Sequence, residues 1–144
     1  MIYSKKEIMA AAKKKINKAK SRENAKRNVL TPIGIYKLWE KQGGRCALSS
    51  FLLSPVEGTF PAKCKRPRGQ NFNEYGFAID RIDSTKDYTY DNVQLVTNTA
   101  NQMKGSYDQQ HILTHAAAMF ATSMGLTNNK KLFDDVVKQY EERV

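Results

Sequence analysis

The spacing of apolar residues near the start of the chain predicts two helices. Apolar residues recur at helical intervals over residues 4–27, where Ser4 and Glu7 form a capping-box pattern. A second helix is expected to begin at Thr31, with Pro32 at its first position, and to end at the glycine pair that follows. Its apolar face is expected to pack into the core.

The middle and the end of the chain show short strands followed by helices. A polar turn is expected at residues 84–91, and a loop rich in Pro, Gly, Lys and Asn at residues 54–74. The expected strands are at residues 45–53, 77–82 and 93–96. The expected helices are at residues 97–104, 107–123 and 130–142. This order of elements predicts an α+β fold.

Charge sets the first helix apart from the rest of the chain. The 144 residues carry a net charge of +10, and residues 1–30 hold ten lysines and arginines against two glutamates, so this segment carries +8. Because such a concentration attracts a polyanion, residues 1–30 are expected to form a basic DNA-binding helix or arm ahead of one domain at residues 31–144. A solvated helix that only aids solubility is the alternative. The residues expected to contact DNA are Lys13, Lys14, Lys15 and Lys18.

Composition excludes several classes of protein. No stretch approaches the roughly 20 apolar residues that span a bilayer, so no membrane association is expected. Two cysteines, Cys46 and Cys64, are too few for a disulfide framework or a four-ligand zinc site. An intracellular, reducing compartment is therefore the simplest interpretation.

Oxygen-bearing side chains are concentrated between Phe77 and Lys104. Asp80 ends a strand, and Asn101 lies on the helix that follows the next strand. If the two strands pair and the helix packs over them, these two side chains converge. Carboxylate and amide oxygens suit a hard divalent ion such as Mg²⁺ or Mn²⁺. Two protein ligands leave room for phosphate oxygens, so the pattern predicts metal-dependent hydrolysis of phosphodiesters.

These residues carry a resemblance to a known family. The string AIDRIDSTKDYTYDNVQLVTNTANQMKG resembles the core of the HNH (ββα-metal) endonucleases of phages and bacteria. The upstream string LTPIGIYKLWEKQGGRCALSSFLL resembles the helix and strand that often precede that core, so the likeness runs from Leu30 to Gly105. It implies a ββα-metal core at about residues 75–105 with flanking helices, including C-terminal helices at residues 107–142. It also implies a metal-dependent DNA endonuclease in the cytoplasm of a bacterial cell or phage-infected host.

The resemblance implies roles for single residues. Asp80 matches the first metal ligand, Asn101 matches the helix ligand, and Asn92 matches the asparagine that ties the intervening loop together. Arg81 departs from the family pattern, since most members have at this position the histidine that activates water. Its guanidinium stays protonated, so Arg81 cannot be a base, although it can hold a phosphate with two hydrogen bonds.

The general base must then be another residue, or no protein base is used. Tyr88 is the first candidate, because it lies in the loop near Arg81 and the expected metal. His111 and His115 are alternatives, and their four-residue spacing on one helical face can also bind a metal.

Further basic residues extend the expected DNA surface. The loop from Glu57 to Tyr75 is expected to contact phosphates or base edges, with a solvated surface loop as the alternative. Lys104 is interpreted either as a phosphate contact or as a solvated charge. The basic residues of the loop assigned to DNA binding are Lys65, Arg66 and Arg68.

Two functions of different classes remain open. The first is an active metal-dependent DNA endonuclease of a restriction, homing, junction-resolving or DNA-packaging type. The second is a catalytically silent DNA-binding protein on the same scaffold, in which Arg81 marks the loss of the base. Metal-dependent cleavage discriminates between them. Symmetric cutting of both strands would suggest a homodimer, although the sequence identifies no interface.

Overall fold

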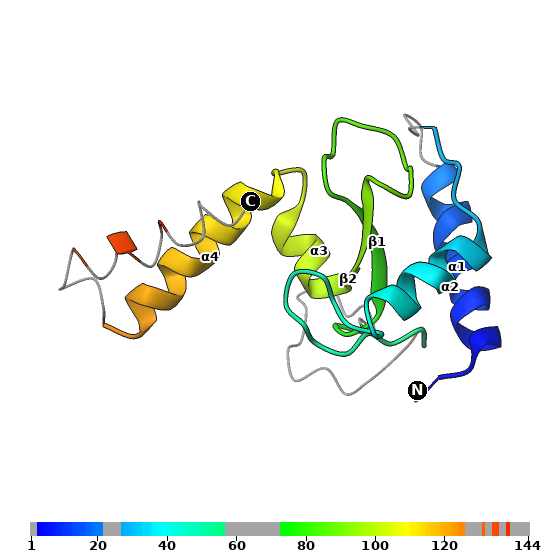
Figure 1. Cartoon of the computed structure of the whole chain (residues 1–144), viewed down its shortest axis with the longest axis horizontal. Coiled ribbons are helices and arrows are strands. Elements are labelled where there is room, and N and C mark those ends of the chain that lie inside the picture. The colour runs from blue at the N-terminus through cyan, green and yellow to red at the C-terminus, as the bar shows by residue number, and fades with distance from the viewer. Residues whose placement is uncertain are drawn as a thin grey trace, which may run out of the picture. The chain divides into compact units, whose positions relative to one another are not determined.

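The computed structural model describes residues 3–21, 27–56 and 73–125, together with residues 131, 134, 135 and 138. Over these residues the chain forms four helices and a two-stranded antiparallel sheet, which confirms the expected α+β class (Figure 1). The chain divides into two compact units, residues 1–103 and residues 104–144. This division differs from the expected one, in which an arm at residues 1–30 precedes a single domain at residues 31–144.

Helix α1 (Lys5–Lys20) begins with the capping box expected from the sequence. The Ser4 hydroxyl accepts a hydrogen bond from the Glu7 amide, and the Glu7 carboxylate accepts one from the Ser4 amide at 2.8 Å. These bonds satisfy amides that the start of a helix leaves unpaired. The helix ends at Lys20, where Ser21 caps it, so the expected extension to about residue 27 is wrong. Residues 22–26 lie outside the described ranges.

The apolar face of α1 packs against helix α2 (Pro32–Lys41). On α1 this face buries Ile8, Ala11, Ala12 and Ile16. The small alanines allow the two helices to approach closely, and Ile8 is fully buried. The basic helix is therefore an integral part of the first unit, because its apolar side contributes to the hydrophobic core of that unit.

Helix α2 begins and ends at the residues that the sequence indicates. The Thr31 hydroxyl accepts a hydrogen bond from the Gly34 amide at 3.2 Å, and Pro32 occupies the first turn. After the helix the backbone passes through Gly43 and Gly44 with φ angles of 62° and 68°, a region that favours glycine.

Tyr90 ties the loop between the two strands to the start of α2. Its hydroxyl accepts a hydrogen bond from the Thr31 amide at 2.9 Å and lies 2.9 Å from the Thr31 hydroxyl. Gly34 makes this contact possible, because a Cβ atom at this position would overlap the Tyr90 hydroxyl. A glycine inside a helix usually weakens it, and here the missing side chain provides the space for an aromatic ring.

The sheet is a hairpin of strands β1 (Phe77–Arg81) and β2 (Val93–Thr97). The pairing is antiparallel and places Asp80 opposite Gln94. Because successive side chains of a strand point to opposite faces, Phe77 and Asp80 lie on different faces of the hairpin. Phe77 packs edge-to-face on Trp39 of α2, with ring centroids 5.5 Å apart. The Phe77 face is thus the one that packs on α2.

Helix α3 (Asn98–Lys104) follows β2 directly. The Thr97 hydroxyl accepts a hydrogen bond from the Ala100 amide at 3.1 Å and so caps the first turn. Figure 1 shows α3 on the side of the hairpin opposite to α1 and α2. The face that carries Asp80 and Gln94 is therefore directed toward α3.

The strand expected at residues 45–53 is wrong. This segment makes one isolated bridge, between Arg45 and Leu52, and otherwise forms tight turns. Ser50 has a φ of 60°, which breaks the extended conformation. The segment runs beside β2 without a regular ladder, since the Ala47 amide donates to the Leu95 carbonyl at 3.0 Å.

The second unit contains helix α4 (Gln109–Ser123), in agreement with the helix expected there. The Asp108 carboxylate caps it by accepting a hydrogen bond from the His111 amide at 2.9 Å. Most of the helix expected at residues 130–142 lies outside the described residues. Among the helices that are described, none combines the length and apolar character needed to cross a bilayer.

Candidate functional site

Asp80 and Gln94 form a polar pair inside the hairpin. The Gln94 amide nitrogen donates a hydrogen bond to the Asp80 carboxylate at 2.9 Å. Both residues are buried, with 5% and 7% of their surface exposed. A carboxylate removed from water requires hydrogen-bond donors, and this bond also fixes its orientation. The hairpin thus holds an oriented carboxylate on the face directed toward α3.

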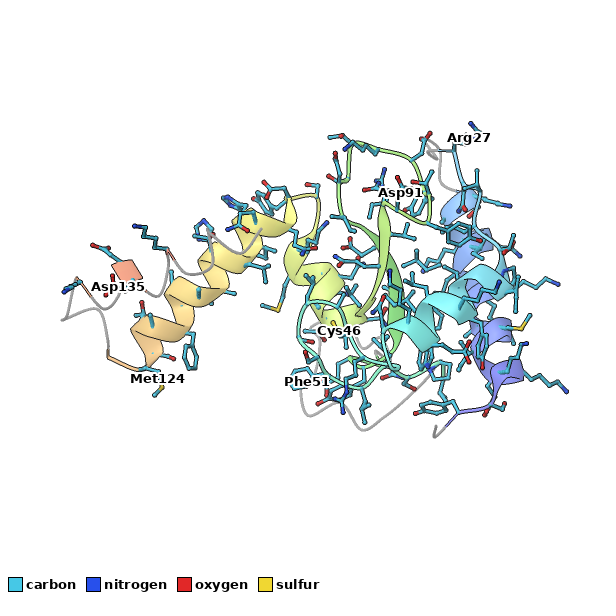
Figure 2. The ribbon with its side chains drawn as sticks, viewed as in Figure 1. Arg27, Cys46, Phe51, Asp91, Met124 and Asp135 are labelled. Carbon is cyan, nitrogen blue, oxygen red and sulfur yellow. The ribbon has the colours of Figure 1, made fainter. Side chains whose placement is uncertain are left out.

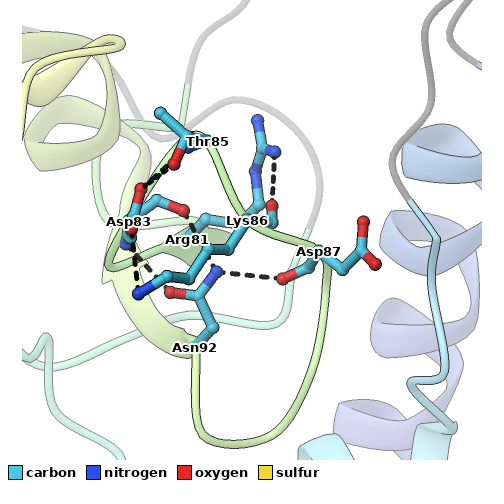
Figure 3. Close-up of polar contacts among 6 residues, drawn as sticks. All are labelled: Arg81, Asp83, Thr85, Lys86, Asp87 and Asn92. Carbon is cyan, nitrogen blue, oxygen red and sulfur yellow. Dashed lines mark hydrogen bonds and ion pairs between the residues drawn. The ribbon is translucent and has the colours of Figure 1, made fainter.

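Asn92 ties together the loop between the strands, residues 82–92 (Figure 3). Its side-chain oxygen accepts a hydrogen bond from the Asp83 amide at 2.9 Å. Its side-chain nitrogen donates to the carbonyls of Asp83 at 3.0 Å and Asp87 at 2.9 Å. One buried amide therefore satisfies three backbone groups and fixes the course of the loop. The expectation that Asn92 ties the loop is confirmed, and its assignment as a catalytic residue stays a prediction.

Asp83 binds the residues that follow it in the loop. Its carboxylate accepts hydrogen bonds from the Thr85 hydroxyl at 2.6 Å and the Thr85 amide at 2.9 Å, and it lies 3.1 Å from the Lys86 ammonium. The Thr85 hydroxyl first, then the Thr85 amide and Lys86, lower the pKa of Asp83 to about 2. Asp83 is therefore a loop-forming residue.

The Arg81 guanidinium also packs on the loop. It donates a hydrogen bond to the Lys86 carbonyl at 2.8 Å (Figure 3). Its central carbon lies 4.9 Å from the centroid of the Tyr88 ring. Strand alternation directs Arg81 and Asp80 toward opposite faces of the hairpin. The contacts of Arg81 given above brace the loop, and its expected role in holding a phosphate stays a prediction.

Tyr88 belongs to the hydrophobic core, with 7% of its surface exposed. Its backbone pairs with the segment that leads into α2. The Tyr88 amide donates to the Arg27 carbonyl at 2.9 Å, and the Tyr88 carbonyl accepts from the Val29 amide at 3.2 Å. Tyr88 thus packs the loop onto the rest of the first unit. Its assignment as general base stays a prediction, and it requires a largely covered phenol to reach the substrate.

Asn101 lies in the middle of α3 and is half-buried. Asp80 and Asn101 therefore come from the hairpin and from the helix on the same side of it, the two elements expected to hold a metal. Their carboxylate and amide oxygens fit the ligand preference of Mg²⁺ and Mn²⁺. In the part of the chain that the structure describes, no three His, Cys, Asp or Glu side chains form a metal-binding group. A metal held here would rely on Asp80, Asn101 and water.

Lys104 is the last residue of α3 and is fully buried, with 0% of its surface exposed. The interpretation of Lys104 as a solvated charge is therefore wrong. A buried ammonium does not reach a polyanion in solvent, so a phosphate contact would first require this side chain to become uncovered. Lysines are rarely buried unless their charge has partners. The buried position of Lys104 therefore indicates a structural role for this side chain.

The other residues assigned to DNA binding fall into two groups. On α1, Lys13, Lys14 and Lys18 are exposed and Lys15 is half-buried. Figure 2 shows long side chains along α1 on the side away from the hairpin. These lysines are therefore accessible to a polyanion, and their contact with DNA stays a prediction. The assigned residues Lys65, Arg66 and Arg68 lie outside the described residues.

Sequence reasoning missed Gln94, the residue that orients Asp80. A signal was present in the alternation of the two strands. Asp80 is the last but one residue of β1 and Gln94 is the second residue of β2, so an antiparallel hairpin places them opposite each other. The sequence alone does not give this pairing, because the length of the loop does not determine the register of the two strands.

No protein-family model, curated protein or solved structure matches this chain. The resemblance to HNH endonucleases therefore rests on the two quoted strings alone.

Proposed function

We propose that this protein is a metal-dependent DNA endonuclease of the HNH type. The observation that carries the proposal is the buried Asp80 carboxylate, which Gln94 holds at 2.9 Å on the hairpin face directed toward α3. A buried, oriented carboxylate is a suitable ligand for a divalent cation, and we infer that the Asn101 amide oxygen on α3 supplies the second ligand. DNA would be the substrate, and the cytoplasm of a bacterial cell or phage-infected host would be the compartment.

Asp80 and Asn101 are the residues that would hold Mg²⁺ or Mn²⁺. When bound, the cation would supply Lewis-acid chemistry to a phosphodiester group. The chain itself contributes orientation: Gln94 fixes the Asp80 carboxylate, and the three hydrogen bonds of Asn92 keep the neighbouring loop in one conformation. Residues that orient a metal ligand usually affect affinity or activity by about 10–100-fold when replaced.

A cleavage assay tests the proposal directly. Supercoiled plasmid and a branched DNA would be incubated with the protein and Mg²⁺, Mn²⁺ or EDTA, and the products separated on gels. We expect cleavage with a metal, no cleavage with EDTA, and loss of cleavage in Asp80→Asn. Asp91→Asn is the matched control, because it changes an exposed carboxylate in the loop between β1 and β2 and is expected to retain activity. Equal activity of Asp80→Asn and Asp91→Asn would reject the assignment of Asp80.

Tyr88→Phe separates two versions of the reaction. This change keeps the ring that packs in the core and under Arg81, and it removes only the hydroxyl. If Tyr88 is the general base, cleavage falls by about 100-fold or more while the free energy of unfolding changes little. Near-normal cleavage by Tyr88→Phe would remove Tyr88 and leave His111, His115 or the absence of a protein base.

The lysines of α1 are proposed to bind the DNA backbone. The triple variant Lys13→Gln, Lys14→Gln and Lys18→Gln removes three exposed charges from the outer side of the helix. Each lost phosphate contact lowers the slope of log affinity against log salt by about 0.9, so the slope should fall by about 3 if all three lysines make contact. An unchanged slope in fluorescence-anisotropy titrations would place the DNA on another surface.

A catalytically silent DNA-binding protein is the second candidate, and one observation favours it. The Arg81 guanidinium, at the position of the usual catalytic histidine, donates to the Lys86 carbonyl and packs on Tyr88, which is a structural use. In this case DNA binding is equal in EDTA and in Mg²⁺, and no product forms with any metal.

If the protein instead cuts both strands of DNA, a second copy of the chain is expected to supply the second site.

A further inference from the structure

Two histidines lie one turn apart on α4, in the second unit of the chain. His111 and His115 are both exposed, and the centroids of their rings are 4.5 Å apart with an interplanar angle of 50°. Both imidazoles therefore project from the same side of the helix and meet in solvent. Residues four positions apart on a helix are neighbours, so the backbone itself maintains this arrangement.

We propose that His111 and His115 form a chelating site for a borderline divalent transition-metal ion, such as Ni²⁺, Cu²⁺ or Zn²⁺. Neutral imidazole nitrogens are preferred ligands of these ions, with metal–nitrogen distances of about 2.0–2.1 Å. Two ligands of one ion must therefore approach within about 4 Å of each other. Rings whose centroids are 4.5 Å apart meet this requirement after small side-chain rotations, without a change in the helix.

The first turn of α4 fixes one of the two ligands. The Asp108 carboxylate accepts a hydrogen bond from the His111 amide at 2.9 Å and so holds the start of the helix. Tyr107 stacks on the His111 ring, with centroids 5.1 Å apart and an interplanar angle of 22°. The stacked ring restricts the orientation of His111, which lowers the entropy that binding an ion must remove.

The proposed site differs in chemistry from the site proposed for catalysis. It offers nitrogen ligands, whereas Asp80 and Asn101 offer oxygen ligands that suit Mg²⁺ and Mn²⁺. Within the described ranges no third His, Cys, Asp or Glu completes a cluster with the two histidines, so water would fill the other coordination positions. Such a two-ligand site would exchange its metal readily with solvent. The inference does not depend on nuclease activity.

Isothermal titration of the full-length, metal-free protein with NiCl₂ tests the site. We expect the wild type to show a Ni²⁺-binding step that weakens by about 10-fold or more in His111→Ala and in His115→Ala. The sharpest control is the double variant His115→Ala with Ala116→His. It keeps two histidines but spaces them five apart, on different sides of the helix, and it should bind as weakly as the single variants.

Three further measurements make the outcome unambiguous. Circular dichroism of His111→Gln, which keeps a polar side chain on a folded helix, should match the wild type while Ni²⁺ affinity falls. The Ni²⁺-binding step that depends on His111 should be unchanged in Asp80→Asn, which separates this site from the proposed catalytic one. Titration with MgCl₂ should give the same heat in the wild type and in His111→Gln. Binding of Ni²⁺ with equal affinity in the wild type and in the five-spaced variant would overturn the proposal, as would an absence of binding in the wild type.

Discussion

The strands and the loop of the β1–β2 hairpin use their aspartates in different ways. In the loop, the Asp83 carboxylate binds Thr85 and Lys86, which follow it within three positions. In the strand, the Asp80 carboxylate is buried and binds Gln94, which is 14 positions away on the other strand. The two aspartates are separated by only two residues, yet their surroundings come from different parts of the chain.

Backbone geometry explains this difference. In a loop, a short polar side chain reaches the amides of the next two or three residues, so the local sequence decides its partners. In a strand, the adjacent side chains point to the opposite face, so the partner comes from the neighbouring strand and depends on the register. The contacts of Asp83 are therefore made with its neighbours in the loop. The strand face presents a carboxylate whose environment is assembled across the hairpin.

Gln94→Glu disrupts the Asp80–Gln94 pair and should cause the largest loss of stability among these variants. The change replaces a buried donor by a second carboxylate opposite Asp80, which leaves two buried acidic groups facing each other. We expect a loss of about 3 kcal/mol in the free energy of unfolding at pH 7, measured with urea. Gln102→Glu, the same change at an exposed position of α3, should cost less than about 0.5 kcal/mol. Similar losses in both variants would contradict the buried pair.

Asn92→Ala disrupts the loop between the strands and should cause the next largest loss of stability. It removes three hydrogen bonds and leaves the backbone groups of Asp83 and Asp87 without this partner. We expect a loss of about 2–3 kcal/mol in urea unfolding. The control is Asn17→Ala on the exposed side of α1, where alanine is a better helix former and stability should be unchanged or slightly higher. A loss below about 1 kcal/mol in Asn92→Ala would mean that the loop does not depend on this amide.

Arg81→Lys tests how much the guanidinium adds to the loop. Lysine keeps the charge but loses the planar group that lies over Tyr88 and donates to the Lys86 carbonyl. The expected cost is about 1 kcal/mol in thermal or urea unfolding. Arg27→Lys makes the same change at an exposed position and should be nearly neutral. An Arg81→Lys variant as stable as Arg27→Lys would assign Arg81 to a role outside the loop.

The titration of Asp83 gives the smallest and most local effect. Its pKa is lowered to about 2 in the folded protein, from an ordinary value of 3.8. The folded state thus favours the carboxylate, so the stabilising contribution is complete above about pH 3.8 and is lost as the pH falls through about 2. Carbon-detected NMR of the side-chain carboxyl should show this midpoint. In Thr85→Val, which removes the hydroxyl donor, the midpoint should move toward the ordinary value; an equal midpoint in both proteins would contradict the assigned cause.

The elements that follow local rules could be predicted from the sequence. The capping box of Ser4 and Glu7, and the Thr31–Pro32 start of α2, depend on residues within one helical turn. The hairpin and α3 were also expected, because the apolar alternation stops at the polar residues of the loop. The tie formed by Asn92 was implied by the resemblance, since one asparagine at the start of a strand does not by itself indicate three bonds.

Features that depend on distant residues could not be predicted. Residues 45–53 are apolar enough for a strand, but the left-handed backbone at Ser50 and the neighbouring edge of β2 impose turns. Lys104 has a basic side chain on a short helix, where exposure is the ordinary expectation, yet it is fully buried. The contribution of α1 to the core was hidden by its charge, because alanines such as Ala11 and Ala12 carry little hydrophobic signal.

The hydrogen bonds between Tyr90 and Thr31 bear on the order in which the first unit folds. They join residues 59 positions apart, whereas the bond from the Asp83 amide to Asn92 closes a loop of nine positions. Longer loops lose more entropy on closure and local contacts form faster, so we expect the hairpin loop to form before it docks on α2. Gly34 leaves open the space that Tyr90 enters on docking. A side chain at position 34 would therefore obstruct this late step and leave the hairpin able to form.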